Sequence, residues 1–101
     1  MEITRNVSGS LVELALNGKL DSNTAVLLEK EIDNVLVEEN FYNLEINMAE
    51  LTYLSSAGLR VILGAQKKLN SIEAHLTVTN ANDNIKSVFE ITGFLGIINI
   101  V

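Results

Sequence analysis

Two adjacent serines, Ser55 and Ser56, are the residues of this chain best placed to do chemistry. They follow a strand-like pattern and a connecting loop, and they precede an apolar helical pattern that begins at about Ala57. At a helix N-terminus the first backbone N–H groups lack partners within the helix, and the helix dipole is positive. Such a position suits a hydroxyl that caps the helix and also tolerates a phosphate. The pair is therefore a candidate phosphorylation switch.

The residues that follow the serines favour a role beyond capping. Serine is among the common N-cap residues, so its position alone would predict only a cap. Ala57 and Gly58 leave the hydroxyls uncrowded, although glycine in the first turn of a helix costs up to about 1 kcal/mol relative to alanine. We interpret these small residues as room for a molecule that approaches closely.

The other polar residues do not suggest an enzyme or a metal site. The sequence has no cysteine, and no G-x-S-x-G nucleophile motif accompanies its single histidine, His75, which we expect at a strand edge. Residues 80–84 contain three asparagines and an aspartate, but they lack the glycine and the distal glutamate of a calcium loop. They stand where a turn and a helix cap are needed. We therefore expect no catalytic residue, no metal and no cofactor.

Length and composition restrict the remaining possibilities. A chain of 101 residues predicts one domain, residues 1–101, and 48% hydrophobic with 5% aromatic residues predicts an aliphatic core. The net charge of -6 and the scattered basic residues argue against direct binding of nucleic acid. No apolar run approaches the roughly 20 residues that span a bilayer, and residues 1–5 lack the apolar core of a signal peptide. We expect a soluble cytoplasmic protein without membrane contact.

The periodicity of apolar residues predicts strands that alternate with helices. The expected strands cover 3–6, 11–16, 44–48, 76–78 and 97–100, and the expected helices cover about 23–39, 57–69 and 83–91. The first two strands form a hairpin, and the later alternation implies parallel pairing with right-handed crossovers. The predicted fold class is α/β: a mixed, mostly parallel sheet of about five strands, with three to four helices packed mainly on one face.

Three segments resemble one known family. Residues 54–59 read Leu-Ser-Ser-Ala-Gly-Leu, residues 18–25 read Gly-Lys-Leu-Asp-Ser-Asn-Thr-Ala, and residues 76–100 contain a strand, a helix, a glycine turn and a short strand. In these segments the chain resembles the STAS domains, and among them the single-domain bacterial anti-sigma factor antagonists. The resemblance covers essentially the whole chain and implies a single STAS domain over residues 1–101.

The resemblance implies a regulatory protein rather than an enzyme. Such a protein binds an anti-sigma factor, typically also a serine kinase, and so regulates sigma-factor-dependent transcription by partner switching. Ser56 is implied as the phosphoacceptor, with Ser55 as the second choice and as a local cap, and a serine phosphatase would reverse the modification. The residues implied in partner binding are Asp21, Ser55, Ser56, Ala57, Gly58 and Arg60.

Asp21 also has a simpler interpretation. Its position just before Ser22 and Asn23 is typical of a residue that starts a helix, while the resemblance places its loop beside the serine loop. Thr24 is expected in the first helical turn.

Two departures from the common family pattern leave alternatives open. Ser55 and Asn47 stand where many members have aspartate. The first alternative is a STAS-domain accessory subunit of a transporter or lipid-trafficking complex, in which the serine loop docks without being phosphorylated. The second and weakest is a small enzyme with Ser56 as its nucleophile, since no oriented base accompanies that serine.

Overall fold

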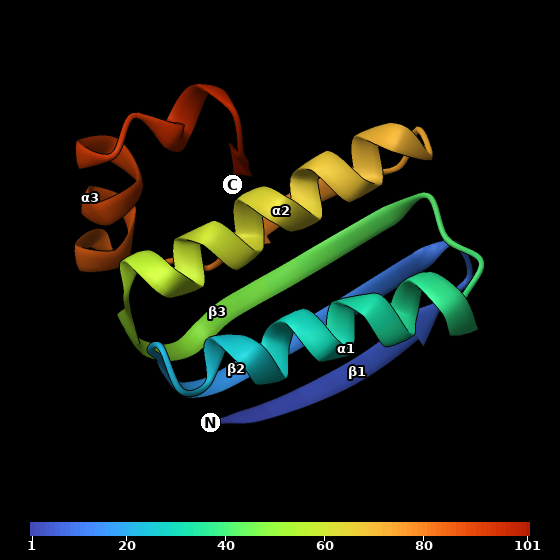
Figure 1. Ribbon diagram of the computed structural model, residues 1–101, viewed down its shortest axis with the longest axis horizontal. Helices are drawn as coiled ribbons and strands as arrows, with labels where there is room; N and C mark the ends of the chain where they lie inside the picture. The colour runs from blue at the N-terminus through green and yellow to red at the C-terminus, as the bar shows by residue number, and fades with distance from the viewer.

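The computed structural model describes residues 1–94 and 96–101 in full, and Leu95 in its backbone alone (Figure 1). In chain order the elements are β1 (Glu2–Ser8), β2 (Leu11–Leu20), α1 (Ala25–Glu38), β3 (Asn43–Leu54), α2 (Ser56–Ser71), β4 (His75–Thr79), α3 (Asp83–Ile91), the 3-10 helix η1 (Phe94–Gly96) and β5 (Asn99–Ile100). The predicted order of strands and helices is confirmed, including the predicted bounds of α3.

The five strands form one sheet in the order β1-β2-β3-β4-β5. β1 and β2 pair antiparallel as the predicted hairpin, and Gly9 in their turn has the positive φ of 59° that glycine adopts without strain. The other three pairings are parallel. The prediction of a mixed, mostly parallel sheet is therefore confirmed.

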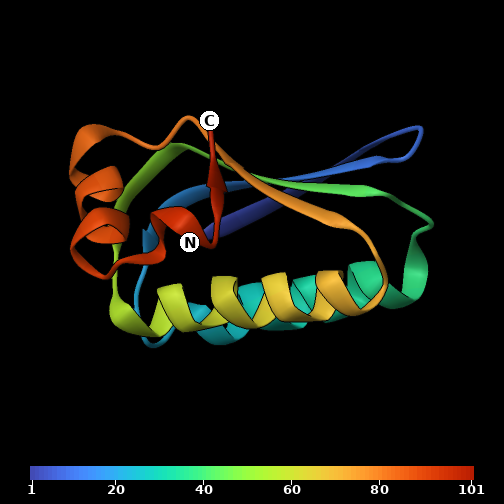
Figure 2. The ribbon, with the colours of Figure 1, turned by 90° about the horizontal axis from the view of Figure 1, so that it is seen from above.

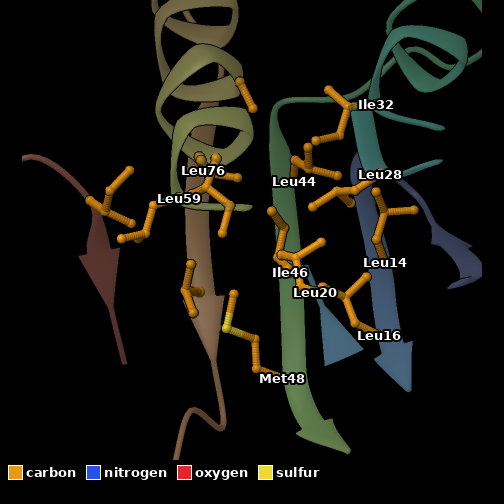
Figure 3. Packing of buried hydrophobic residues seen from close by; sticks show 14 of the residues in the cluster. Leu14, Leu16, Leu20, Leu28, Ile32, Leu44, Ile46, Met48, Leu59 and Leu76 are labelled. Atoms are coloured by element: carbon orange, nitrogen blue, oxygen red, sulfur yellow. The ribbon is translucent and has the colours of Figure 1, made fainter. Parts of the chain in front are cut away.

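Helices α1 and α2 lie side by side on one face of the sheet (Figure 2). Alternate residues of β2 and β3 point toward them, among them Leu14, Leu16, Leu44, Ile46 and Met48, which are all buried (Figure 3). α3 lies at the end of the sheet where β3 runs into α2 (Figures 1 and 2). Helices thus pack mainly on one face, as predicted, and the core is aliphatic apart from the fully buried Phe89.

Two strand predictions were wrong. β3 does not end in a loop before the serines but continues to Leu54, paired with β2 throughout. Two register irregularities in this pairing put Met48, Leu51 and Leu54 inside at three-residue spacing, so the sequence loses the alternation that predicts a strand. The last strand covers only 99–100 instead of the expected 97–100. Residues 94–96 form a 3-10 helix, and residues 97 and 98 lie between this helix and the strand.

An ion-pair cluster joins the edge strand β1 to α1. Arg5 points to the helix side of the sheet, since it is paired with the buried Leu14. Its guanidinium contacts three carboxylates of α1 and the residue that follows it: Glu31 at 2.7 Å, Glu38 at 3.1 Å and Glu39 at 3.1 Å. These carboxylates, Glu31 first, raise the pKa of Arg5. The local sequence pattern does not predict this cluster.

Candidate phosphorylation and partner-binding site

Ser55 is the N-cap of α2. Its backbone is extended, with φ -92° and ψ 169°, and its Oγ accepts a hydrogen bond from the backbone N–H of Gly58 at 3.2 Å. Its carbonyl accepts the first bond of the helix, from the N–H of Leu59 at 3.0 Å. The expectation that Ser55 caps the helix is confirmed, and its hydroxyl is engaged in the fold.

Ser56 is the first residue of α2 and its side chain is exposed. Among the residues that the structure describes, none forms a hydrogen bond with its hydroxyl. The first backbone N–H groups of the helix and its positive dipole end lie at this position. The two adjacent serines thus differ in chemistry: one hydroxyl satisfies the backbone, and the other is open to solvent and to an approaching enzyme.

Gly58 lies beneath this surface rather than on it. A Cβ at this position would lie 2.6 Å from Cγ and 2.9 Å from Cδ2 of Leu20, and 3.0 Å from Cδ1 of Leu54. Those distances are too short for any side chain, so glycine lets α2 approach the ends of β2 and β3. Our interpretation that Gly58 leaves room for a partner was therefore wrong, because two leucines already fill that room. Ala57 is half-buried.

The Asp21 loop lies next to the serines. The backbone N–H of Ser55 donates to the carbonyl of Leu20 at 2.9 Å, so Leu20 holds the site through its backbone as well as its side chain. This contact confirms that the two loops are neighbours. The importance of Leu20 was not predicted, because its one signal in the sequence is its place as the apolar residue just before Asp21.

Asp21 and Thr24 bond to each other and start α1. Oδ1 of Asp21 accepts from the N–H of Asn23 at 2.9 Å and from the N–H of Thr24 at 3.0 Å, while Oγ1 of Thr24 accepts from the N–H of Asp21 at 2.9 Å. The hydrogen bonds that its carboxylate accepts, first the one from the N–H of Thr24, lower the pKa of Asp21. The helix-start interpretation of Asp21 is confirmed, and its charge is maintained beside the serine loop.

Comparisons with known proteins identify the family of this chain. The family model for the STAS domain matches residues 2–101. This chain belongs to the STAS domain family. An anti-sigma-B factor antagonist of Listeria monocytogenes is 32% identical over 89 residues, which cover 88% of this chain and 77% of that protein.

Solved structures of STAS proteins share this fold. The anti-sigma factor antagonist SpoIIAA in its unphosphorylated form superposes with a TM-score of 0.78 at 18% identity, covering 99% of this chain and 87% of that one. Its phosphorylated form gives a TM-score of 0.76 at 18% identity, covering 99% and 91%. An anti-sigma factor antagonist from Mycobacterium paratuberculosis gives 0.87 at 19% identity, covering 98% and 83%. At such low identities the likeness shows the fold.

Asn47 forms hydrogen bonds with neighbouring segments of the sheet. Oδ1 of Asn47 accepts from the N–H of Ala49 at 3.0 Å and from Nδ2 of Asn80 at 3.1 Å, while its Nδ2 donates to Glu13 at 3.2 Å. An aspartate could not donate to Glu13. The amide therefore links three neighbouring segments of the sheet.

Arg60 lies one helical turn after Ser56 on the outer side of α2 and is exposed. In the part of the chain that the structure describes, no carboxylate oxygen comes within 4.0 Å of its guanidinium. The exposed residues that surround the serines on this surface are therefore uncharged or positive along α2, with the ionised Asp21 on the neighbouring loop.

The remaining polar candidates have structural roles. His75 begins β4, is exposed, and its N–H donates to the carbonyl of Tyr42 at 2.8 Å. Asn82 caps α3 by accepting from the N–H of Ile85 at 2.9 Å. Both predictions, strand edge and helix cap, are confirmed. Among the described residues, no cluster of acidic or histidine side chains is suited to hold a metal, and no helix is long and apolar enough to cross a bilayer.

Proposed function

We propose that this STAS domain protein is an anti-sigma factor antagonist that acts in the cytoplasm. In its unphosphorylated form it binds an anti-sigma factor, itself a serine kinase, and thereby frees a sigma factor for transcription. Relatives that bear the name anti-sigma factor antagonist, one of them 32% identical, support this assignment. No step of the proposed function requires catalysis by this chain.

The division of roles between the two serines carries the proposal. A kinase needs a hydroxyl that is accessible and not already committed to the fold. The Ser55 hydroxyl caps α2, whereas the Ser56 side chain is exposed at the first helical residue. Ser56 is therefore the proposed phosphoacceptor, and a serine phosphatase restores the binding form.

Phosphorylation changes binding through charge rather than through the fold. A phosphate adds about -1.5 to -2 charges at pH 7. This charge weakens binding to a partner whose surface is matched to a neutral hydroxyl. The same charge is favourable at the N-terminus of α2, where free N–H groups and the helix dipole meet it. The modified protein thus stays folded while it loses its partner.

The proposed contact surface consists of the two loops and the exposed start of α2. It includes Asp21, Ser55, Ser56, Ala57 and Arg60, and Gly58 contributes by packing beneath it. The backbone hydrogen bond between Ser55 and Leu20 holds the two loops next to each other, which supports a single continuous surface.

Phosphorylation of purified variants tests this function. Wild type incubated with ATP and the anti-sigma factor kinase of its own organism should gain one phosphate, located on Ser56 by peptide mapping. Ser56→Ala should gain none, whereas the matched control Ser55→Ala should still be labelled. Phosphate found on Ser55 alone, or labelling that survives Ser56→Ala, would refute the assignment.

A further inference from the structure

The outer side of α2 continues beyond Arg60 as a stripe, which we define as Ser56, Arg60, Gly64 and Lys67; Gly64 is half-buried and the other three residues are exposed. These residues recur at intervals of three and four, so they lie on one face of the helix. The buried residues of α2 occupy the opposite side of the helix. The sheet lies on one side of α2 (Figure 2), so the stripe faces away from it. Both cationic side chains of the stripe are exposed.

Gly64 has no packing reason to be glycine. A Cβ there would meet no atom within 4 Å, in contrast to the crowded Gly58 of the same helix. Its backbone is helical, and glycine inside a helix is less stable than alanine. The free protein therefore retains a destabilising residue at a half-buried position, although a side chain there would meet no neighbouring atom.

The charge of α2 is opposite to that of the chain. The helix contains Arg60, Lys67 and Lys68, three of the seven basic residues, and no acidic residue, although the net charge of the chain is -6. Lys68 is paired with Asp33 of α1 at 2.7 Å. Arg60 lies in the second turn, close to the positive end of the dipole, where a cation is disfavoured. As with Gly64, local stability does not explain this residue.

A small hollow lies between α1 and α2 beside the stripe, and Gly64 is the one residue of the stripe that lines it. Its lining comes from both helices: Glu29, Ile32, Val61, Gly64, Ala65 and Lys68. The absence of a side chain at residue 64 lets another backbone approach the helix closely at this point.

We propose that the stripe binds an acidic helix of the anti-sigma partner, which crosses α2 at Gly64. The inference rests on the proposed function and extends its contact surface along α2. Positive charge on an otherwise acidic chain complements acidic side chains of the partner, and the bare backbone accommodates close crossing. A phosphate on Ser56 would then place negative charge at one end of a surface that binds negative charge.

Titration of the anti-sigma factor with stripe variants tests this inference. Gly64→Ala should raise the melting temperature and weaken binding about fivefold, and Lys67→Glu should weaken binding about tenfold. Two matched controls lie outside the stripe: Gly96→Ala, where a Cβ also meets open space, and Lys86→Glu, an exposed lysine of α3. Both controls should bind as wild type does.

The outcomes separate this inference from the proposed function. If Ser56→Glu weakens binding while Gly64→Ala and Lys67→Glu bind as wild type, the docking site is wrong and the proposed function stands. If wild type itself does not bind the anti-sigma factor, both are wrong. A lower melting temperature for Gly64→Ala would show a structural glycine and overturn the inference, as would a wild-type dimer in sedimentation that Gly64→Ala dissociates.

Discussion

Arg5 and Arg60 show two different uses of a positive charge in an acidic chain. Arg5 forms ion pairs with three carboxylates and joins the edge strand to α1. Arg60 is exposed on α2, and no described carboxylate pairs with it. The comparison indicates that the β1–α1 edge is built for stability, whereas the outer face of α2 is available for a partner.

The position of the Arg5 cluster explains why a cation is needed there. Two of its carboxylates, Glu38 and Glu39, lie at the C-terminal end of α1, where the helix dipole disfavours negative charge. Arg5 neutralises this end and holds it against the sheet. By contrast, among the residues that the structure describes, Lys68 is the one cation of α2 that is paired with a carboxylate, that of Asp33.

The largest expected effect on stability comes from removing the Arg5 ion-pair cluster. Arg5→Ala leaves three carboxylates close together and should lower the free energy of unfolding by about 1–2 kcal/mol, measured by urea denaturation. The loss should shrink in high salt, because screening weakens both attraction and repulsion. Binding to the anti-sigma factor should stay at the wild-type value. A binding defect in a folded Arg5→Ala protein would break the comparison.

Removal of the Ser55 cap should have the next largest effect on stability. Ser55→Ala removes the acceptor for the N–H of Gly58 and should cost about 1 kcal/mol in thermal or urea unfolding. Ser55→Asp, which retains an acceptor oxygen, serves as the control and should recover most of this stability. If Ser55→Ala were as stable as wild type, the hydroxyl would not be committed to the fold, and the distinction between the serines would fail.

Arg60 should give the reverse pattern from Arg5. Arg60→Glu should change stability by less than about 0.5 kcal/mol, as exposed substitutions usually do, and should weaken partner binding about fivefold. Circular dichroism and calorimetric titration of the same sample measure both. Unchanged affinity would place the interface away from α2.

The smallest expected effect concerns pH and the Asp21 loop. Because the folded pKa of Asp21 is lowered, its charge stabilises the protein above its unfolded pKa, about 3.9, and that contribution is lost as pH falls through the folded pKa. Asp21→Asn should therefore be slightly less stable than wild type at neutral pH and equal to it in strong acid. A difference independent of pH would assign the effect to hydrogen bonding alone.

The sequence predicted best what depends on local pattern. Apolar periodicity predicted α1, α2 and α3, and alternation predicted the hairpin and the first half of β3. It missed the second half of β3, because the register irregularities that follow Asn47 break the alternation. It also misjudged Gly58, since the crowding by Leu20 depends on contact between residues that are distant in sequence.

The Arg5 ion-pair cluster and the hollow between α1 and α2 could not be predicted from local sequence pattern for the same reason. Arg5 is separated by 26 to 34 positions from the carboxylates that it contacts, and nothing in the sequence aligns them before the edge strand meets α1. The serine pair, however, could be recognised as a helix start from the sequence, and the hydrogen bond from the N–H of Gly58 to Oγ of Ser55 confirms the cap expected there.

Calorimetric titration of the anti-sigma factor with wild type, Ser56→Ala and Ser56→Glu, alongside a thermal melt of each, tests the central claim most directly. Ser56→Ala should bind within about twofold of wild type, and Ser56→Glu at least about tenfold more weakly. The melt of Ser56→Glu should be unchanged or higher, since a negative group at a helix N-terminus contributes about 0.3–1 kcal/mol in its favour. If Ser56→Glu bound as tightly as Ser56→Ala, or lost binding only because it unfolded, the electrostatic switch at Ser56 would be contradicted.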